Sequence, residues 1–477
     1  MSQLLPYFEF QLTSHQHYVF SCLQDFVRNP PVRICILKGQ AGTGKTALMK
    51  GFIRWLDEQG LNYKLLATTG RAAKILALKS RHSAFTIHHE LYVFKDLNED
   101  LEKLSRSLEN QKNLGGQIRL LFSLKQIQSD QPTVYIIDEA SMISDQPDAN
   151  SYARFGSGNL LLDILTFHPK AKLIFIGDHC QLPPVNQLFS PALQASYLRS
   201  NYNQHVCEYE LHEVMRQANT SGIVAAATQI RRQYQNNVQE RFGYIKLKGY
   251  SDIRLYNSSI SLVNEYLSYI RTKSYNDCTL ICQTNRHCTE LNRLIRQNLF
   301  NHHSTLQPGD LLLITQNNPI SGLMNGDQVE VRSVGKTIYH CNLTFRDIRA
   351  ETIHDGQTHN LLIIEDILQS GLTNLTALQH RNLIIDFYRR MRQQGIKQKD
   401  PAFAEAMQHD PLLNAVRAVY GYAITCHKSQ GGEWKDVFLY TDNKIQGIPR
   451  PGFYQWWYTA VTRASHCLHA VNDWYIH

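Results

Sequence analysis

Gly39-Gln40-Ala41-Gly42-Thr43-Gly44-Lys45-Thr46 is the stretch of sequence that decides the fold. It has the pattern of a phosphate-binding loop, in which glycines let backbone N–H groups curl around phosphates and the following helix adds its positive end. The apolar run Ile34 to Leu37 precedes the loop, and an apolar helical face that Gly60 can terminate follows it. That face consists of Leu48, Met49, Phe52, Ile53 and Leu56. We therefore expect a nucleotide site between a buried strand and a helix.

The chemistry of the loop predicts ATP and Mg²⁺ as cofactors. Lys45 would place a point charge on the β- and γ-phosphates, and the Thr46 hydroxyl would reach Mg²⁺. A second apolar run, Val134 to Ile137, ends at Asp138 and Glu139. Carboxylates at the C-terminal end of a strand lie where α/β sheets bind their ligands. We expect Asp138 to hold Mg²⁺ and Glu139 to orient or activate the attacking water.

Continuous apolar runs alternate with helical patterns along the chain, which predicts parallel sheets covered on both faces. The runs fall into two groups and imply two α/β domains: Ile34 to Leu37, Lys64 to Ala67, Val134 to Ile137 and Leu173 to Ile176, then Leu280 to Cys282 and Val437 to Tyr440. The length of 477 residues allows about two to four domains.

Two segments interrupt this alternation. In the first, residues 89–131, the leucines 97, 101, 104 and 108 lie on one face of a helix, which we expect to pack on its own domain rather than on a partner protein. The second, residues 306–410, opens with Pro308-Gly309-Asp310 and carries the hairpin signal Asn325-Gly326, which predicts a small antiparallel barrel. Its later half turns helical and contains a basic stretch from Arg381 to Lys399. A solvated helix face explains that stretch more simply than phosphate contact does.

Composition narrows the class of protein only a little. The net charge is +8, from 49 Lys plus Arg against 41 Asp plus Glu, which permits a polyanionic partner without requiring one. Scattered cysteines inside apolar runs indicate reduced thiols and a cytoplasmic protein. No apolar run reaches membrane-spanning length, and we expect no secretory signal. Cys278, Cys282, His287 and Cys288 suggest zinc, but a buried strand explains the first two and no second ligand pair follows.

Taken in order, the motifs of the chain resemble those of superfamily 1 helicases. The phosphate loop is motif I, and the others are Ala67 to Ala73 (Ia), Thr86 to His88 (Ib), Asp138 to Met142 (II), Gly177 to Val185 (III), Leu211 to Gln217 (IV), Thr425 to Gly431 with Glu433 (V) and Tyr458 to Ala464 (VI). The Ala-Gly-Thr-Gly-Lys-Thr, Asp-Glu-Ala-Ser-Met and His-Lys-Ser-Gln-Gly forms of motifs I, II and V are similar to the RecD/Dda-like branch of the superfamily 1B DNA helicases.

The resemblance implies an α/β fold of two RecA-like P-loop NTPase domains, with a small insertion in the first and an SH3-like β-rich insertion in the second. Motor domain 1A is then expected at residues 1–88 and 132–205, and inserted domain 1B at 89–131. Motor domain 2A is expected at 206–305 and 411–477, and inserted domain 2B at 306–410, whose C-terminal edge is left open by its extra length.

The resemblance also implies roles for single residues. The catalytic set is Lys45, Asp138, Glu139, Gln181, Arg216 and Arg463. Within it, Gln181 links the γ-phosphate to the DNA track, and the two arginines reach the γ-phosphate, where planar cations stabilise developing charge. Gln16 reads adenine and Glu433 contacts ribose, in addition to the eight loop residues. The expected DNA-backbone contacts are Thr69, Arg71, His88, Thr425, His427 and Ser429. Tyr92 and Phe94 are candidates for base stacking, although core positions explain both more simply.

The expected activity is ATP hydrolysis coupled to 5′-to-3′ movement on single-stranded DNA and to unwinding of DNA forks. DNA repair, recombination, replication or phage defence would use such an activity. Two alternatives remain open. One is a nucleic-acid-dependent ATPase that remodels protein–DNA complexes without separating strands, and the other is a regulatory NTP-binding subunit of a larger assembly. The complete set of hydrolysis residues argues against the second alternative.

Overall fold

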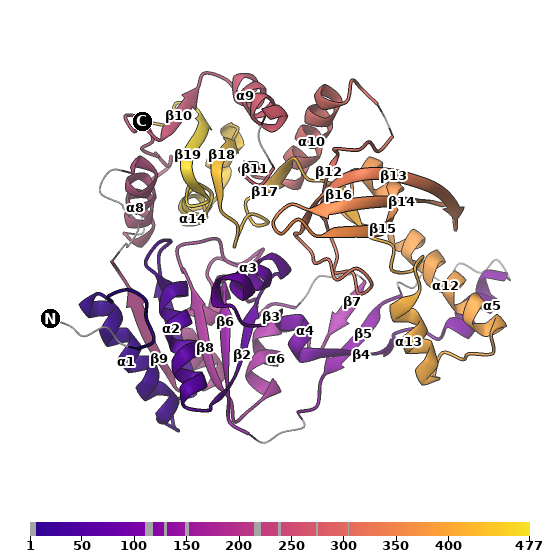
Figure 1. The fold of residues 1–477 in the computed structure, drawn as a ribbon, viewed down its shortest axis with the longest axis horizontal. Helices are drawn as coiled ribbons and strands as arrows, with labels where there is room; N and C mark the ends of the chain where they lie inside the picture. Colours follow the sequence, from indigo (N-terminus) through magenta and orange to yellow (C-terminus); the bar gives the residue numbers. More distant parts are fainter. Residues whose placement is uncertain are drawn as a thin grey trace.

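Two parallel sheets, each flanked by helices, form the lower and upper lobes of the molecule in a computed structural model (Figure 1). The structure describes residues 6–109, 118–127, 131–147, 152–213, 221–236, 240–272, 275–303 and 305–477. Both sheets come from the apolar runs of the sequence, and all six runs are strands. The two α/β domains and their parallel sheets are thus confirmed.

The lower lobe is motor domain 1A, a six-stranded sheet whose neighbours all pair in parallel. Its strands, in spatial order, are β3 (Ala84–Thr86), β2 (Asn62–Ala67), β6 (Thr133–Asp138), β8 (Lys172–Gly177), β1 (Ile34–Gly39) and β9 (Val206–Leu211). Its helices are α1 (Ser14–Arg28), α2 (Lys45–Glu58), α3 (Gly70–Ser80), α4 (Ile87–Leu91), α6 (Leu160–Phe167) and α7 (Ala195–Tyr202). The predicted apolar face of α2 is buried in the core, because all five of its residues contact the sheet cluster.

The upper lobe is motor domain 2A, a five-stranded sheet that is also parallel throughout. Its strands, in spatial order, are β10 (Ile253–Tyr256), β19 (Ala464–Val471), β18 (Trp434–Tyr440), β11 (Cys278–Cys282) and β17 (Ala423–Thr425). Its helices are α8 (Gly222–Gln235), α9 (Ser259–Thr272), α10 (Asn285–Leu299) and α14 (Gly452–Val461). All of β11 is buried, which confirms the buried strand predicted at its two cysteines.

Inserted domain 2B is an antiparallel barrel, as the hairpin signal predicted. Its strands, in spatial order, are β15 (Thr358–Ile364), β14 (Leu343–Thr352), β13 (Gln328–His340), β12 (Leu311–Ile314) and β16 (Ala418–Tyr420). Gly326 turns the chain between β12 and β13 with φ of 95°, a conformation that favours glycine. Val416 closes the sheet, because its N–H donates to the Leu362 carbonyl at 2.7 Å and its carbonyl accepts from Ile364 at 3.1 Å. The helices α11 (Glu365–Ser370), α12 (Ala377–Gln393) and α13 (Pro401–His409) complete the insertion.

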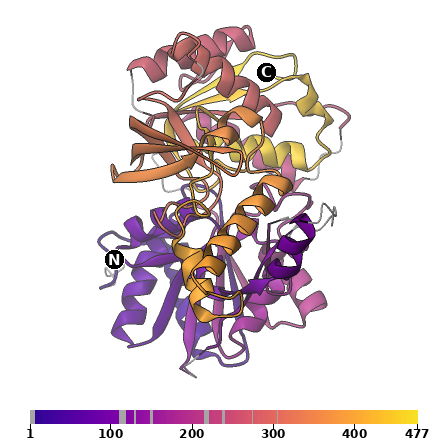
Figure 2. The same cartoon turned by 90° about the vertical axis from the view of Figure 1, so that its right-hand side faces the viewer.

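Inserted domain 1B consists of a three-stranded sheet and one helix, and that helix packs across to domain 2B. The strands are β4 (Tyr92–Leu97), β5 (Leu120–Leu124) and β7 (Ala153–Phe155), and the helix is α5 (Leu101–Glu109). Figure 2 shows α5 beside the orange helices α12 and α13, and Gln398 of the α12–α13 connection accepts the Leu101 N–H at 2.9 Å.

The expectation that this leucine face packs on its own domain is therefore wrong. Leu97 ends β4, and Leu101 and Leu104 join one apolar cluster with Phe387 and Phe403 of domain 2B. The side chain of Leu108 lies outside the described residues. Three short strands offer little apolar surface, so the helix buries its face against the neighbouring insertion.

Three of the predicted domain boundaries are wrong, because hydrogen-bonded pairing assigns short strands to other sheets. β9 pairs with β1, so domain 1A extends beyond residue 205 to Leu211. β7 pairs with β5 and belongs to 1B, although residues 132–205 were expected in 1A. β16 pairs with β12, so the barrel of 2B takes up residues beyond 410. None of the described helices is long and apolar enough to cross a membrane.

Candidate active site

A cavity of about 900 Å³ lies between the two motor domains. The phosphate loop, Asp138, Glu139 and Gln181 line it from domain 1A, together with one face of α3. The segment from Gly431 to Lys435 and Arg463 line it from domain 2A, and the turn from Gly326 to Gln328 lines it from domain 2B. The cavity therefore collects the ends of motifs I, Ia, II, III, V and VI from elements far apart in the sequence.

The phosphate loop has the geometry that its glycines predict. Gly42 and Gly44 both have φ of 82°, and Gly44 directly precedes α2. A Cβ atom on Gly39 would lie 2.7 Å from Thr43 Oγ1, so the tight loop needs glycine there. Lys45 Nζ donates to the carbonyls of Gly39 at 2.5 Å and Gln40 at 3.0 Å. Burial lowers the pKa of Lys45, while Asp178, Glu139 and Asp138 oppose that effect.

The two carboxylates of motif II lie at the C-terminal end of β6, as predicted. Asp138 Oδ1 accepts the Glu139 N–H at 2.9 Å. Burial raises the pKa of Asp138, and burial together with the adjacent Asp138 raises that of Glu139. Glu139 has φ of 51°, a strained conformation for a residue with a side chain, of the kind that clusters at functional sites.

The residues around the loop fit a nucleotide with Mg²⁺. The Thr46 hydroxyl and the Asp138 carboxylate line the same cavity from α2 and β6. Both are hard oxygen donors, which is the ligand type that Mg²⁺ prefers. Lys45 and the N-terminus of α2 add the positive charge that phosphates require.

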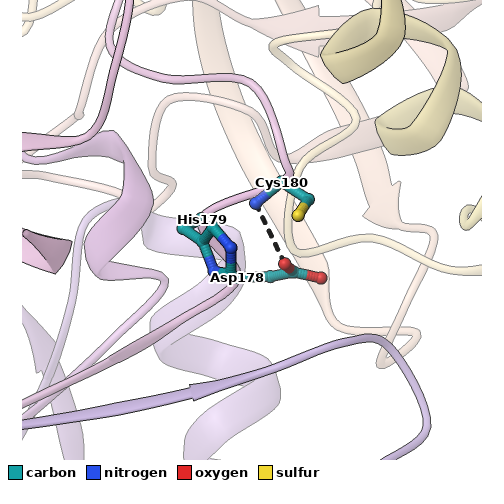
Figure 3. A group of neighbouring side chains, drawn as sticks. All are labelled: Asp178, His179 and Cys180. Atoms are coloured by element: carbon teal, nitrogen blue, oxygen red, sulfur yellow. Dashed lines mark hydrogen bonds between the residues drawn. The ribbon is translucent and has the colours of Figure 1, made fainter. Parts of the chain in front are cut away.

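Motif III, of which Figure 3 draws Asp178, His179 and Cys180, forms a buried contact between the two motor domains. Asp178 accepts the N–H of Cys180 at 3.1 Å, as drawn, and also Arg231 Nη1 at 3.0 Å and the Tyr458 hydroxyl at 2.5 Å. Arg231 belongs to α8 and Tyr458 to α14, both in domain 2A. Since three donors already satisfy this carboxylate, Asp178-His179-Cys180 is better suited to joining the domains than to binding a metal ion.

Gln181 and Arg463 line the cavity from the two motor domains. The Gln181 carbonyl accepts Gln455 Nε2 of α14 at 3.2 Å, and the Gln181 side chain lines the cavity. Arg463 is 5% exposed and donates to the carbonyls of Thr459 and Gly432, both at 3.0 Å. Its side chain is thus supported by domain 2A on the opposite side of the cavity from Lys45. Arg216 lies outside the described residues.

Gln16 and Glu433 flank this centre. Gln16 is buried against the phosphate loop, where its Nε2 donates to the Thr43 carbonyl at 3.2 Å. It also completes a capping box with Thr13 at the start of α1, so a local structural role accounts for part of its environment. Glu433 lines the cavity beside Gly432.

Known proteins resemble this chain in sequence and in fold. A model of the AAA domain matches residues 23–249, and a model of the UvrD-like helicase C-terminal domain matches residues 420–471. The ATP-dependent DNA helicase dda of Enterobacteria phage T4 is 25% identical over 71% of this chain and 68% of its own length. Together these matches support a superfamily 1B helicase.

Two further matches cover nearly the whole length of this chain. An uncharacterized protein, R530, of Acanthamoeba polyphaga mimivirus is 23% identical over 94% of this chain and 97% of its own. The crystal structure of the Pif1 helicase from Bacteroides in complex with ADP-AlF3 and ssDNA has a TM-score of 0.50 and 15% identity, covering 97% of this chain and 92% of that one. This structural likeness shows a shared fold, including the RecA-like motor domains.

The residues that were expected to contact the DNA backbone differ in their surroundings. Thr69 caps α3 by accepting the Ala72 N–H at 3.2 Å, and His88 packs edge-on against Phe155 with ring centroids 4.9 Å apart. Thr425 accepts the Lys428 N–H at 3.4 Å, and burial lowers the pKa of His427. Ser429 is fully buried and donates to the Cys426 carbonyl at 2.8 Å. Arg71 lies inside the nucleotide cleft.

The two aromatic candidates for base stacking differ in their surroundings. Tyr92 is 6% exposed and donates its hydroxyl to Asp163 at 2.7 Å, so the simpler core interpretation is confirmed for it. Phe94 is half-buried and meets Phe122 edge-on, with ring centroids 5.7 Å apart.

Sequence reasoning missed several residues of the site. Arg231, Asp327 and Gln328 were not among the expected site residues. Trp434 directly follows Glu433 and was not singled out. The position of Trp434 beside motif V could have indicated that it lines the site. The other three residues reach the site only through contacts between domains, which the sequence does not reveal.

Proposed function

We propose that this ATP-dependent DNA helicase moves 5′-to-3′ along single-stranded DNA and separates the duplex ahead of it. The observation that carries the proposal is one cavity with Lys45 and Glu139 on domain 1A and Arg463 on domain 2A. A nucleotide in such a cleft couples its own state to the distance between two domains. The polarity rests on the resemblance of motifs I, II and V to the RecD/Dda-like branch.

The residues of the cleft divide the chemistry between the two motor domains. Lys45 and the loop N–H groups bind the phosphates, and Thr46 with Asp138 would hold Mg²⁺, which supplies charge neutralisation at the phosphates. Glu139 is placed to accept a proton from the attacking water, because burial and Asp138 raise its pKa and strengthen it as a base. Arg463 and Arg216 would stabilise the charge that develops as the γ-phosphoryl group is transferred.

Motif III is suited to carrying the state of the nucleotide to the rest of the molecule. Gln181 lines the cavity, and the next residue, Leu182, donates its N–H to Thr459 of α14 at 2.8 Å and accepts Gln430 Nε2 of motif V at 2.9 Å. A shift of the γ-phosphate contact at Gln181 would therefore reach motifs V and VI through single hydrogen bonds. We assign DNA contacts to Thr69, His88, Thr425 and His427 of motifs Ia, Ib and V, and to the fully buried Ser429 a supporting role inside motif V.

Partial duplexes of equal stability test the proposal. One carries only a 5′ single-stranded tail and the other only a 3′ tail, each in a DNA and an RNA version. We expect ATP-dependent unwinding of the 5′-tailed DNA. Unwinding of the 3′-tailed substrate alone would overturn the polarity, and a preference for RNA would overturn the assigned substrate.

The same assay separates the remaining functions. DNA-stimulated ATP turnover without strand separation on either fork would favour an ATPase that remodels protein–DNA complexes. Nucleotide binding without DNA-stimulated turnover would favour a regulatory NTP-binding subunit. We assign the helicase to DNA repair, recombination, replication or phage defence, because those processes supply single-stranded tails and forks. Its scattered, reduced cysteines favour the cytoplasm.

A further inference from the structure

Arg71, which the motif pattern assigns to DNA, lies inside the nucleotide cleft. It follows the first residue of α3 and lines the same cavity as Lys45 and Glu139. Its guanidinium carbon lies 4.3 Å from the ring centroid of Trp434, so the indole covers one face of the cation. Burial lowers the pKa of Arg71 to about 10, with Asp327 opposing this and Arg463 adding to it.

Contacts place the Arg71 guanidinium at the end of the cleft where hydrolysis would occur. A Cβ atom on Gly432 would lie 3.1 Å from Arg71 Cζ, and the Gly432 carbonyl accepts Arg463 Nη1 at 3.0 Å. A Cβ atom on Gly431 would lie 3.9 Å from Glu139 Cγ. Arg71 is therefore separated from both Glu139 and Arg463 by the same glycine pair of motif V.

Most of the N–H donors of the Arg71 guanidinium are available to bind a ligand. Within the part of the chain that the structure describes, its one hydrogen bond runs from Nη1 to Gln328 Oε1 at 3.5 Å, the long limit for such a bond. The nearby carboxylate of Asp327 is bound by Lys74 Nζ at 2.6 Å and by the Met324 N–H at 2.8 Å. Arg71 is half-buried at the cavity wall, and the planar fork of a guanidinium with free donors suits phosphate oxygens best.

We propose that Arg71 binds the terminal phosphate of the bound nucleoside triphosphate, as an arginine supplied by motif Ia of domain 1A. Trp434 holds the plane of the guanidinium, and the Gly326–Gln328 turn of domain 2B closes the cleft behind it. The inference rests on the proposed ATP site and assigns Arg71 to nucleotide recognition instead of the DNA backbone.

Binding measurements with Arg71→Ala and Arg71→Lys test the assignment. Isothermal titration with Mg²⁺ and a non-hydrolysable ATP analogue, or with ADP, is performed without DNA, and single-stranded DNA affinity is measured by anisotropy without nucleotide. We expect Arg71→Ala to weaken the ATP analogue roughly tenfold or more, the effect of a lost charge-assisted hydrogen bond, while ADP and DNA affinities change less than about twofold. Arg71→Lys should be intermediate, because lysine keeps the charge and loses the planar fork.

Arg28→Ala is the matched control. Arg28 is exposed and lies outside the cleft, and its guanidinium carbon is 5.5 Å from the ring centroid of the buried Trp55. Its removal should leave all three affinities unchanged. Loss of DNA affinity with unchanged nucleotide affinities in the Arg71 variants would overturn the inference, as would equal weakening of ADP and the ATP analogue. Unwinding of only 3′-tailed forks would overturn the proposed polarity without affecting these binding results.

Discussion

Lys74 Nζ lies 2.6 Å from Asp327 Oδ2 and joins helix α3 of domain 1A to the inserted barrel of domain 2B. Asp327 is 2% exposed, and its side chain also accepts the Met324 N–H. Gly70, at the start of α3, makes this docking possible, because a Cβ atom there would lie 2.1 Å from Met324 Cβ. The inserted domain is thus held against the nucleotide cleft by a buried carboxylate and a close backbone approach.

Asp327→Ala should loosen this docking. The change leaves the Lys74 ammonium and the Met324 N–H without their acceptor, which should cost about 2 kcal/mol, less than a fully buried pair because Lys74 is partly exposed. Denaturant unfolding measures the loss. Glu290→Ala, which breaks the exposed pair of Glu290 and Arg286, is the control and should change stability by less than about 0.5 kcal/mol. Equal effects of the two substitutions would show that the Lys74–Asp327 pair is energetically an ordinary surface contact.

Lys45→Ala should abolish ATP hydrolysis without unfolding the protein. The folded state lowers the pKa of Lys45, which means that the buried charge is unfavourable to folding near neutral pH. Its removal should therefore leave the melting temperature unchanged or slightly higher while turnover falls at least about a hundredfold. A steady-state ATPase assay and a thermal melt suffice. Near-normal turnover by the folded variant would remove the phosphate-loop assignment.

Glu139→Gln should bind nucleotide and DNA but turn over ATP more slowly by at least about a hundredfold, because the amide keeps the shape and loses the basicity. The pH profile gives an independent test. The pKa of Glu139 is raised, so the deprotonated base is lost at a higher pH than for an ordinary glutamate as the solution is acidified. The acidic limb of kcat should lie above the usual glutamate range. A residual rate within about tenfold of wild type would assign the base elsewhere.

Arg463→Ala should lower kcat far more than it weakens ATP binding. The arginine is held across the cavity from Lys45 by the Thr459 and Gly432 carbonyls, a position suited to charge that develops during the reaction. Arg463→Lys separates the loss of charge from the loss of these supporting bonds. Titration with an ATP analogue and single-turnover hydrolysis give the two quantities. A loss of affinity as large as the loss in kcat would make Arg463 a ground-state contact only.

Single-stranded DNA should stimulate turnover, and its affinity should fall steeply with salt. Contacts to the DNA backbone release counterions, with a slope of about −0.7 for each neutralised phosphate. Anisotropy titrations over a range of NaCl concentrations measure the slope. A flat dependence would argue against a channel that tracks phosphates.

The local parts of the nucleotide site were predictable because each depends on residues adjacent in sequence. The phosphate loop, the strand before it and the helix after it all follow from the order of glycines and apolar residues between Ile34 and Leu56. Asp138 and Glu139 were located for the same reason, since a buried strand ends directly before them. Motif order then placed Gln181 and Arg463 at the same cavity.

Pairing between distant segments was not predictable in this way. β9, β7 and β16 are only three to six residues long and have no linker to mark a change of domain, so their sheet membership depends on which edge offers free hydrogen-bonding groups. The leucine face of α5 gave the same difficulty, because amphipathic spacing identifies the buried side of a helix without identifying its partner.

The sequence by itself determined the phosphate-binding loop and the two parallel-sheet α/β domains of this protein. These features depend on glycines and apolar runs that lie close together along the chain. Only the tertiary structure decided that Arg71 lies in the nucleotide cleft, that Asp178 joins the domains through Arg231, and that Asp327 docks the barrel on α3. The Asp178–Arg231 and Lys74–Asp327 contacts join residues 53 and 253 positions apart, where burial and charge pairing select the partner and no periodicity in the sequence records the choice.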